Sequence, residues 1–180
     1  MPDFPENAAK PVPQTIAVQA ADFPKLLALN NDHAAELSLL DGAGFERLIH
    51  HAFLARQTVE ADAFVIAFDQ TAEYDSPNFR WFKSRYERFV YVDRLVVAAA
   101  ARGRGLARAL YDSVFLAAES VGTGRVVCEI NLDPPNPASV RFHEGLRFAQ
   151  IATAVLDAGA KTVGYYERMA RSTGDQGLSG

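Results

Sequence analysis

The segment that most constrains the fold runs from Tyr91 to Glu119, because it changes from a strand pattern to a helix pattern across a glycine-containing turn. Its first part is a valine-rich apolar run, which predicts a buried strand. After four alanines comes the sequence RGRGLA (residues 102–107). From Leu106 onward apolar residues recur at i, i+4 spacing, which predicts a helix with one buried face. The turn therefore lies where a strand leads into the N-terminus of a helix.

A turn of this kind can bind phosphate. The first N–H groups of a helix have no partner within the helix, and the helix dipole places partial positive charge there. Gly103 and Gly105 have no Cβ, so another molecule can approach the backbone, while Arg102 and Arg104 add positive charge. We expect these groups to bind a pyrophosphate. The alternative is a basic turn that only caps the helix, since short glycine motifs recur by chance.

Length, charge and cysteine content narrow the class of protein. A chain of 180 residues fits one domain, and we expect a flexible lead-in at 1–14, a domain at 15–170 and a flexible tail at 171–180. The formal net charge of -4 argues against a protein built to bind nucleic acid. The single cysteine excludes an internal disulfide and fits a reducing compartment. Without an apolar run of membrane-spanning length or a signal-peptide pattern, we expect a cytoplasmic enzyme or binding module.

The rest of the chain predicts further strands and short helices. Before the central segment we expect a strand at 15–19, helices after Asp22 and near 45–52, and two strands at 53–59 and 63–68 that form an antiparallel hairpin. After it we expect a strand at 125–132, a short helix capped by Asn136, and strands at 148–156 and 162–169.

The connection from Asp69 to Arg88 is long and rich in aromatic and basic residues. Long connections in compact domains are often lids or binding loops. We expect Phe79, Trp81 and Phe82, together with Tyr91, to wall a substrate pocket. The alternative, equally favoured, is that these aromatic residues only anchor the segment on the core. Nucleic-acid binding by the same pattern is disfavoured by the acidic chain.

Two motifs carry a resemblance to a known family. Residues 102–107 resemble the acyl-CoA-binding signature R-x-x-G-x-G/A of the GNAT acetyltransferase superfamily. Residues 136–148, NPASVRFHEGLRF, are similar to its second signature, N-x-x-A/S-x-x-F-Y-x-x-x-G-F. The order of elements from Thr15 to Met169 also agrees. Two signatures at the proper separation are stronger together than either is alone.

The sequence departs from the family pattern in three places. Alanines at 98–101 stand where the family often has proline after the strand, with little consequence expected. His143 occupies the usual tyrosine position, and Arg147 stands where glycine is usual, so the bend before Phe148 is expected to differ.

The resemblance implies a single α/β (α+β) domain of the GNAT fold. Its central sheet would be mixed and mostly antiparallel, flanked by helices, with a V-shaped splay between the strands at 91–97 and 126–132. Acetyl-CoA would lie in that opening as the acyl donor, without a metal, and a homodimer is common in the family. The cofactor-binding residues that the resemblance implies are Leu95, Val96, Val97, Arg102, Gly103, Arg104, Gly105, Leu106, Ala107, Asn136, Ser139 and Phe142.

Acyl transfer to an amine needs a group that removes the amine proton and another that protonates the leaving thiolate. Asp93 and Glu129 are the base candidates, and we favour Asp93, because strand alternation places it with Tyr91, Leu95 and Val97 on one face. The alternative for Asp93 is a buried carboxylate paired with an arginine. The same alternation separates Glu129 from Cys128, which we expect to be a packed core residue and not a nucleophile.

His143 is the candidate proton donor to the sulfur of CoA, because it stands at the family's tyrosine position and imidazole can donate near neutral pH. The alternative is a histidine on the helix surface. No cluster of His, Cys and Asp has metal-ligand spacing, so no metal is expected.

Together these features predict an N-acetyltransferase that acts directly, in a ternary complex, on a primary amine: a small molecule, an amino-acid-like compound or a peptide N-terminus. One alternative is a non-catalytic regulatory module that binds acyl-CoA. The other is a nucleotide- or RNA-binding α/β domain that uses the Arg-Gly turn.

Overall fold

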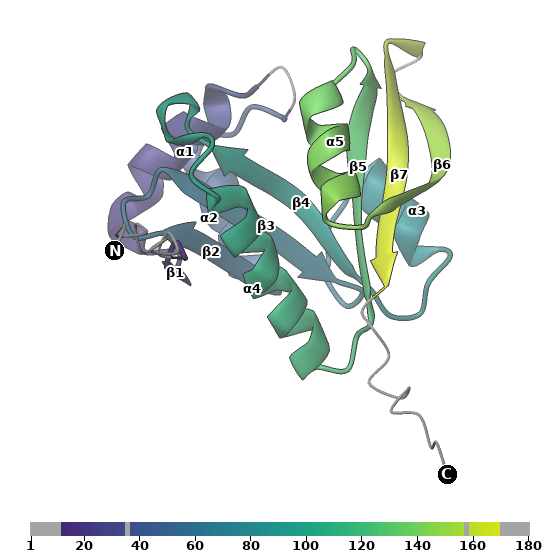
Figure 1. The fold of residues 1–180 in the computed structure, drawn as a ribbon, viewed down its shortest axis with the longest axis horizontal. Coiled ribbons are helices and arrows are strands. Elements are labelled where there is room, and N and C mark those ends of the chain that lie inside the picture. The colour runs from purple at the N-terminus through teal and green to yellow at the C-terminus, as the bar shows by residue number, and fades with distance from the viewer. Residues whose placement is uncertain (1–11, 35–36, 157–158, 170–180) are drawn as a thin grey trace, which may run out of the picture.

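The fold is built on one seven-stranded sheet with helices on both faces (Figure 1). In this computed structural model the described residues are 12–34, 37–156 and 159–169. Residues 1–11 of the expected lead-in, the tail expected at 171–180 and residues 157–158, between the last two expected strands, lie outside them.

The sheet order is β1-β2-β3-β4-β5-β7-β6. The strands are β1 (Thr15–Ala17), β2 (Leu54–Thr58), β3 (Ala63–Asp69), β4 (Val90–Val97), β5 (Arg125–Asp133), β6 (Ala149–Leu156) and β7 (Lys161–Met169). The helices are α1 (Phe23–Asn31), α2 (Gly42–His51), α3 (Pro77–Lys83), α4 (Leu106–Ser120) and α5 (Pro137–Gly145), with short 3₁₀ turns η1 (Ala20–Asp22) and η2 (Ala99–Ala101).

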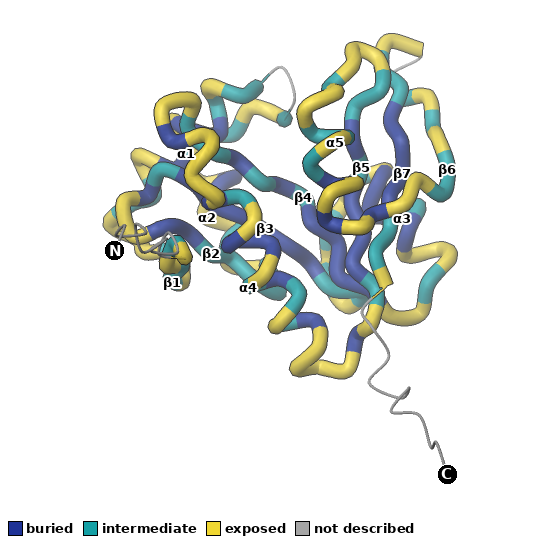
Figure 2. The backbone as a smooth tube through the Cα atoms, viewed as in Figure 1, coloured by how far each residue is buried: buried dark blue, intermediate teal, exposed yellow. Residues whose placement is uncertain are grey.

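Two apolar layers hold the helices against the sheet. On one face α4 and α5 pack on alternate strand residues, and the buried side of α4 has the expected i, i+4 spacing at Leu106, Leu110, Val114 and Ala118. On the other face α1, α2 and α3 cover a second buried cluster that includes Phe45. Figure 2 shows the inner strands β3, β4, β5 and β7 as the most buried part of the sheet. The sheet is therefore protected on both sides, and its central strands are in the interior.

The predicted strands and helices are confirmed within a few residues of their ends, with one omission. The expected hairpin is present, since β2 and β3 pair antiparallel with Leu54 opposite Ala67. The long connection after Asp69, however, contains α3. Its start had a signal in the sequence that was not used: Ser76 is the N-cap and Pro77 is the first helical residue.

β4 and β5 are parallel neighbours that pair only at their beginnings. The pairs are Val90 with Val126 and Tyr91 with Val127. Beyond these pairs β4 continues beside β3, and β5 continues beside β7, so the two strands separate toward their carboxyl ends (Figure 1). This confirms the expected splay between two central strands of a mixed sheet.

A β-bulge in β4 lies just beyond the last β4–β5 pair. Ile66 pairs with Arg94 and Ala67 with Val92, so Asp93 has no partner on β3. A bulge of this kind reverses the side-chain alternation that follows it.

The predicted face of β4 is therefore wrong. Val96 lies in the same buried cluster as Tyr91, whereas Leu95 and Val97 pack on the opposite face, against the layer of α4 and α5. Simple period-two alternation could not show this, because the bulge depends on pairing with β3.

Candidate active site

The turn between β4 and α4 has the geometry expected of a phosphate site. Gly103 and Gly105 have φ of 76° and 81°, a region that L-residues with side chains rarely adopt. Gly105 is the N-cap of α4, and no side chain in the described part of the chain caps this end. Among the described residues, the backbone N–H groups of 103–107 donate to no other group of the chain. Residues 102–105 are exposed, so these donors are available to an anion.

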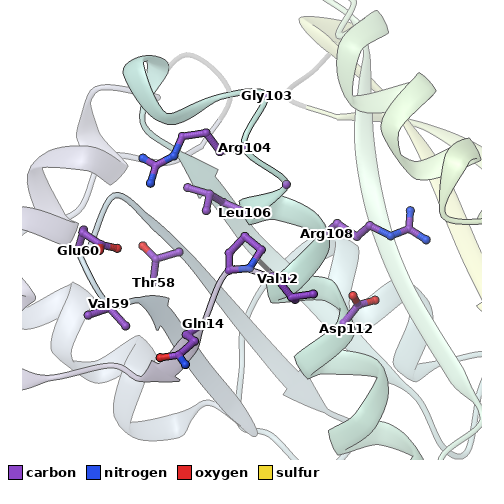
Figure 3. Close-up of a pocket in the computed structure, with 13 residues that line it drawn as sticks. Val12, Gln14, Thr58, Val59, Glu60, Gly103, Arg104, Leu106, Arg108 and Asp112 are labelled. Atoms are coloured by element: carbon purple, nitrogen blue, oxygen red, sulfur yellow. The ribbon is translucent and has the colours of Figure 1, made fainter. Parts of the chain in front are cut away.

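The arginines of the turn have partners within the chain. Arg104 Nη1 is 2.9 Å from Asp62 Oδ2 in the β2–β3 turn, and Arg102 Nη2 is 3.3 Å from His33 Nε2. Arg104 is more than half exposed in this pair, so the ion pair is weak and can exchange for a phosphate. Arg108, one turn further along α4, points away from Arg104 (Figure 3).

A cavity of about 900 Å³ adjoins the turn (Figure 3). Its walls are residues 12–14, the β2–β3 turn at 58–60, Gly103–Leu106 and the side of α4 that carries Arg108 and Asp112. No residue of β4 or β5 lines it. The cavity therefore leads away from the phosphate turn and is distinct from the place where β4 and β5 separate.

Two carboxylates lie at the separation of β4 and β5, on the face covered by α1, α2 and α3. Asp93 is held on both oxygens: Tyr74 donates to Oδ1 over 2.7 Å, and Arg94 Nε donates to Oδ2 over 3.0 Å. Its side chain is 7% exposed. Burial raises the pKa of Asp93, and the charge of Arg94 and the Tyr74 hydrogen bond offset part of that rise. Asp93 thus has the buried, arginine-paired environment that was the alternative to a base.

Glu129 has the opposite environment. Its Oε2 is buried and has no hydrogen-bond partner among the described residues, and the same holds for the hydroxyl of Tyr91. Burial, followed by the negative charge of Asp93, raises the pKa of Glu129 to about 7. Buried polar atoms without a partner are rare and mark places where a ligand can bind. Here an unpaired acceptor and an unpaired donor flank the point where the two strands part.

Three further polar residues belong to this cluster and were not predicted. Tyr74 stacks on Phe68 with centroids 4.3 Å apart and covers Asp93. Tyr165 is the strand partner of Glu129, and its hydroxyl donates to Asn78 Oδ1 over 3.1 Å. Tyr74 and Asn78 come from the long connection between Asp69 and Arg88, which is rich in aromatic and basic residues. Tyr165 had no signal in the sequence, because its position follows from the β5–β7 register.

Cys128 lies on the opposite face from Glu129, as expected. It belongs to the buried cluster under α4 and α5, and burial raises the pKa of its thiol. A buried thiol of this kind is a poor nucleophile.

His143 is buried, and both ring nitrogens are occupied. Nε2 is 2.7 Å from the hydroxyl of Tyr111, and Nδ1 is 2.8 Å from the carbonyl of Ser139. Because a carbonyl only accepts, Nδ1 carries the proton and Tyr111 donates to Nε2. Burial also lowers the pKa of His143. His143 is neither a free proton donor nor the surface residue of the alternative; it is a core residue that links α5 to α4.

The residues expected to contact pantetheine from α5 also have structural roles. Asn136 Oδ1 accepts from the N–H of Ser139 over 3.1 Å as the helix N-cap. Ser139 Oγ is 3.3 Å from His143 Nδ1, and Phe142 packs on Tyr111 with centroids 5.8 Å apart. On β4, Val96 is buried in the α1–α3 layer, so only its backbone is available to a ligand.

The expected pocket wall in the β3–β4 connection is wrong for two of its members. Phe79 and Phe82 have no exposed surface, so they anchor α3 on the core and cannot line a pocket. Trp81 is partly buried, stacking on Tyr165 at 4.1 Å, with the guanidinium of Arg85 3.8 Å from the Trp81 ring centroid. Tyr91 is also buried, so it does not line an open pocket, and only its hydroxyl lies near the carboxylates of Asp93 and Glu129.

Within the described ranges, no group of three or more His, Cys, Asp or Glu side chains is arranged to hold a metal ion. The helices in the same ranges include none with the length and apolar character needed to cross a membrane.

Comparison with solved structures places the fold. The ribosomal-protein-S18-alanine N-acetyltransferase from Escherichia coli matches at a TM-score of 0.65 and 15% identity, covering 91% of this chain and 97% of that one. Ard1 from Thermoplasma volcanium matches at 0.72 and 13% identity, covering 89% and 99%. Arabidopsis thaliana NAA60 in complex with acetyl-CoA matches at 0.68 and 15% identity, covering 87% and 97%. At these identities the likeness shows a shared fold.

The sequence comparisons concern the family. A search of curated proteins finds no significant match. The family model described as "Acetyltransferase (GNAT) family" matches residues 43–148, which is more than half of the chain and includes both signatures. The match agrees with the splayed sheet and the open turn before α4, and the chain belongs to the GNAT acetyltransferase family.

Proposed function

We propose that the protein transfers the acetyl group of acetyl-CoA to a primary amine of a small molecule, an amino-acid-like compound or a peptide N-terminus. The observation that carries the proposal is Glu129 at the point where β4 and β5 separate: its buried Oε2 has no hydrogen-bond partner among the described residues, and its pKa is raised to about 7 although Tyr91 and Asn78 lie near enough to offset part of the rise. A general base works best when its pKa is near the working pH. Membership of the GNAT family and the phosphate turn before α4 support acetyl-CoA as the acyl donor.

The described residues fit acetyl-CoA, which supplies a thioester carbonyl when bound. The N–H groups of 103–107 would hold its pyrophosphate, since a Cβ placed at Gly103 meets no atom within 4 Å and the turn is open. The pantetheine would lie along β4 beyond Tyr91, where β4 has no strand partner on the β5 side. Acetyl-CoA complexes are also found among proteins of this fold, including Arabidopsis thaliana NAA60.

The proposal assigns the base to Glu129 and not to Asp93. Both Asp93 oxygens already accept hydrogen bonds, whereas Glu129 Oε2 is free to accept a proton from the amine. The Tyr91 hydroxyl can donate to the acceptor or to the carboxylate beside it. Transfer would be direct, because Cys128 lies on the other face of β5 and cannot carry the acetyl group. His143 is assigned no proton transfer.

The test is release of free thiol from acetyl-CoA with a panel of primary amines and short peptides. Glu129→Gln should lower kcat by at least about 100-fold, the range for removing a general base, while acetyl-CoA affinity stays unchanged. Wild-type activity should fall as pH drops through about 7, because Glu129 must be deprotonated.

Glu167→Gln is the matched control. Glu167 lies on β7 in an ion pair with Arg125 at 3.1 Å, outside the carboxylate cluster. Its variant should keep wild-type turnover. Acetyl-CoA binding without thiol release for any amine would contradict the enzyme and favour the regulatory module. Full activity of Glu129→Gln would move the base elsewhere.

A further inference from the structure

We propose that Arg94 is a positioning residue that fixes the Asp93 carboxylate at the β4 bulge and thereby keeps a negative charge beside Glu129. The inference rests on the proposed role of Glu129 as base. It concerns how that base is tuned and how the site is tied to the segment between α1 and α2.

Arg94 is a buried cation with partners for each guanidinium nitrogen. Its side chain is 4% exposed. Nε donates to Asp93 Oδ2 over 3.0 Å, Nη1 to Asn30 Oδ1 over 2.7 Å, and Nη2 to Ser38 Oγ over 2.7 Å. Nη1 also reaches the Ser38 carbonyl at 3.2 Å. A guanidinium with this many donors in a fixed plane holds its partners in one geometry.

The bulge explains why Arg94 can reach these partners. After Asp93 the alternation of β4 reverses, so Arg94 projects into the layer of α1 and the segment that follows it. Asn30 is fully buried at the end of α1 and donates to the Ser38 carbonyl at 3.2 Å. Without the bulge, Arg94 would lie on the other face, under α4. One residue therefore links the carboxylates to the α1–α2 segment.

The charge of Arg94 determines which carboxylate titrates. A bare carboxylate at Asp93 would be protonated by burial, but Arg94 and the Tyr74 hydrogen bond favour its charged form. A charged Asp93 in turn raises the pKa of Glu129. The other titratable groups near Glu129 are Tyr91 on β4, Tyr165 on β7 and Tyr74, all with raised pKa values, together with Cys128 behind β5. These tyrosines and the cysteine stay neutral near pH 7, so the charged groups at this place are Asp93 and Arg94.

The experiment is a carboxyl ¹³C NMR titration of the full chain, which reads Glu129 without turnover. In Asp93→Asn the midpoint for Glu129 should move down by about one pH unit or more, because a neighbouring negative charge is lost. In Arg94→Met it should also move down by about one pH unit, because without the guanidinium burial protonates Asp93 and its negative charge beside Glu129 is lost. The acid limb of the pH–rate profile should follow both shifts.

Two controls separate charge from packing. Ser38→Ala removes a contact of the same network but no charge, and Arg125→Met breaks the 3.1 Å ion pair with Glu167 elsewhere on the sheet. Both should leave the Glu129 midpoint unchanged. Should Arg94→Met not fold, Arg94→Gln carries the test, since its amide can still donate hydrogen bonds while the charge is gone.

An unchanged Glu129 midpoint in the Arg94 variants, or the same shift in Ser38→Ala, would overturn the proposal. If no amine is acetylated by the wild type, the proposed function fails, but the titration still decides the role of Arg94.

Discussion

At the scale of single residues, Arg147 forms a left-handed turn at the position where the family signature has glycine. Arg147 has φ of 66°, a left-handed conformation. Its N–H donates to the carbonyl of Glu144 over 2.8 Å, and the next N–H, of Phe148, donates to the carbonyl of His143 over 3.0 Å. These are the two bonds of a Schellman motif that ends α5. Arg147 therefore adopts, at a conformational cost, the left-handed turn that glycine makes most easily.

Arg147→Gly should therefore stabilise the protein. A side chain in the left-handed region costs about 1–2 kcal/mol, and the greater freedom of glycine in the unfolded chain offsets about 0.5–1 kcal/mol. A net gain of about 0.5–1 kcal/mol is expected by urea denaturation. Arg141→Gly, at an exposed position inside α5, is the control and should destabilise by about 1 kcal/mol. Equal losses in both variants would show that Arg147 makes contacts that outweigh its strain.

Gly103→Ala tests the phosphate turn at the same scale. A Cβ at Gly103 meets nothing within 4 Å, so any effect comes from the φ of 76° and not from a clash. The variant should lose about 1–2 kcal/mol of stability and bind acetyl-CoA more weakly, as calorimetry would show. Gly124→Ala has equal room and no positive φ, so it should be neutral. Wild-type affinity in Gly103→Ala would remove this turn from the cofactor site.

At the scale of elements, the N-cap of α5 allows a structural role of Asn136 to be distinguished from a ligand-binding role. Its side chain caps the helix by accepting from Ser139 N–H at 3.1 Å. Asn136→Ala should cost about 1 kcal/mol, whereas Asn136→Asp should change stability little, because a carboxylate accepts the same bond. Thermal unfolding measures both. If Asn136 acts only as a cap, acetyl-CoA affinity should be the same in the Asp variant and the wild type; a selective loss there would reveal contact with the cofactor.

The elements also show which features of the fold and site could be predicted from the sequence and which could not. The strand–turn–helix around residues 102–107 was predictable, because glycine spacing and helical periodicity are local signals. The bulge at Asp93 was not, because it is created by pairing with Ile66 and Ala67 of β3. It moved Arg94 and Val96 to the face opposite to the one predicted. The lack of a hydrogen-bond partner for Glu129 Oε2 among the described residues likewise depends on three strands and α3, and no sequence motif encodes it.

At the scale of the whole molecule, Glu129 links the site to folding stability. Its pKa is about 7 in the folded protein, above the ordinary value of 4.5. The folded state therefore binds more protons than the unfolded state between these values, and stability must fall as pH rises through that window. Each unit of difference is worth about 1.4 kcal/mol, so the total loss is a few kcal/mol, complete somewhat above pH 7.

Glu129→Gln should remove this dependence, because its amide does not ionise. Urea denaturation of the two proteins at pH 5 and pH 8 measures it: the wild type should lose roughly 2–3 kcal/mol more than the variant over that interval. At pH 8 the variant should be the more stable protein, although it is the inactive one. A raised pKa that costs folding stability fits a carboxylate kept for chemistry, since a carboxylate placed for stability would have a lowered pKa. Parallel curves for the two proteins would show that Glu129 reaches water or a partner, and would argue against it as the base.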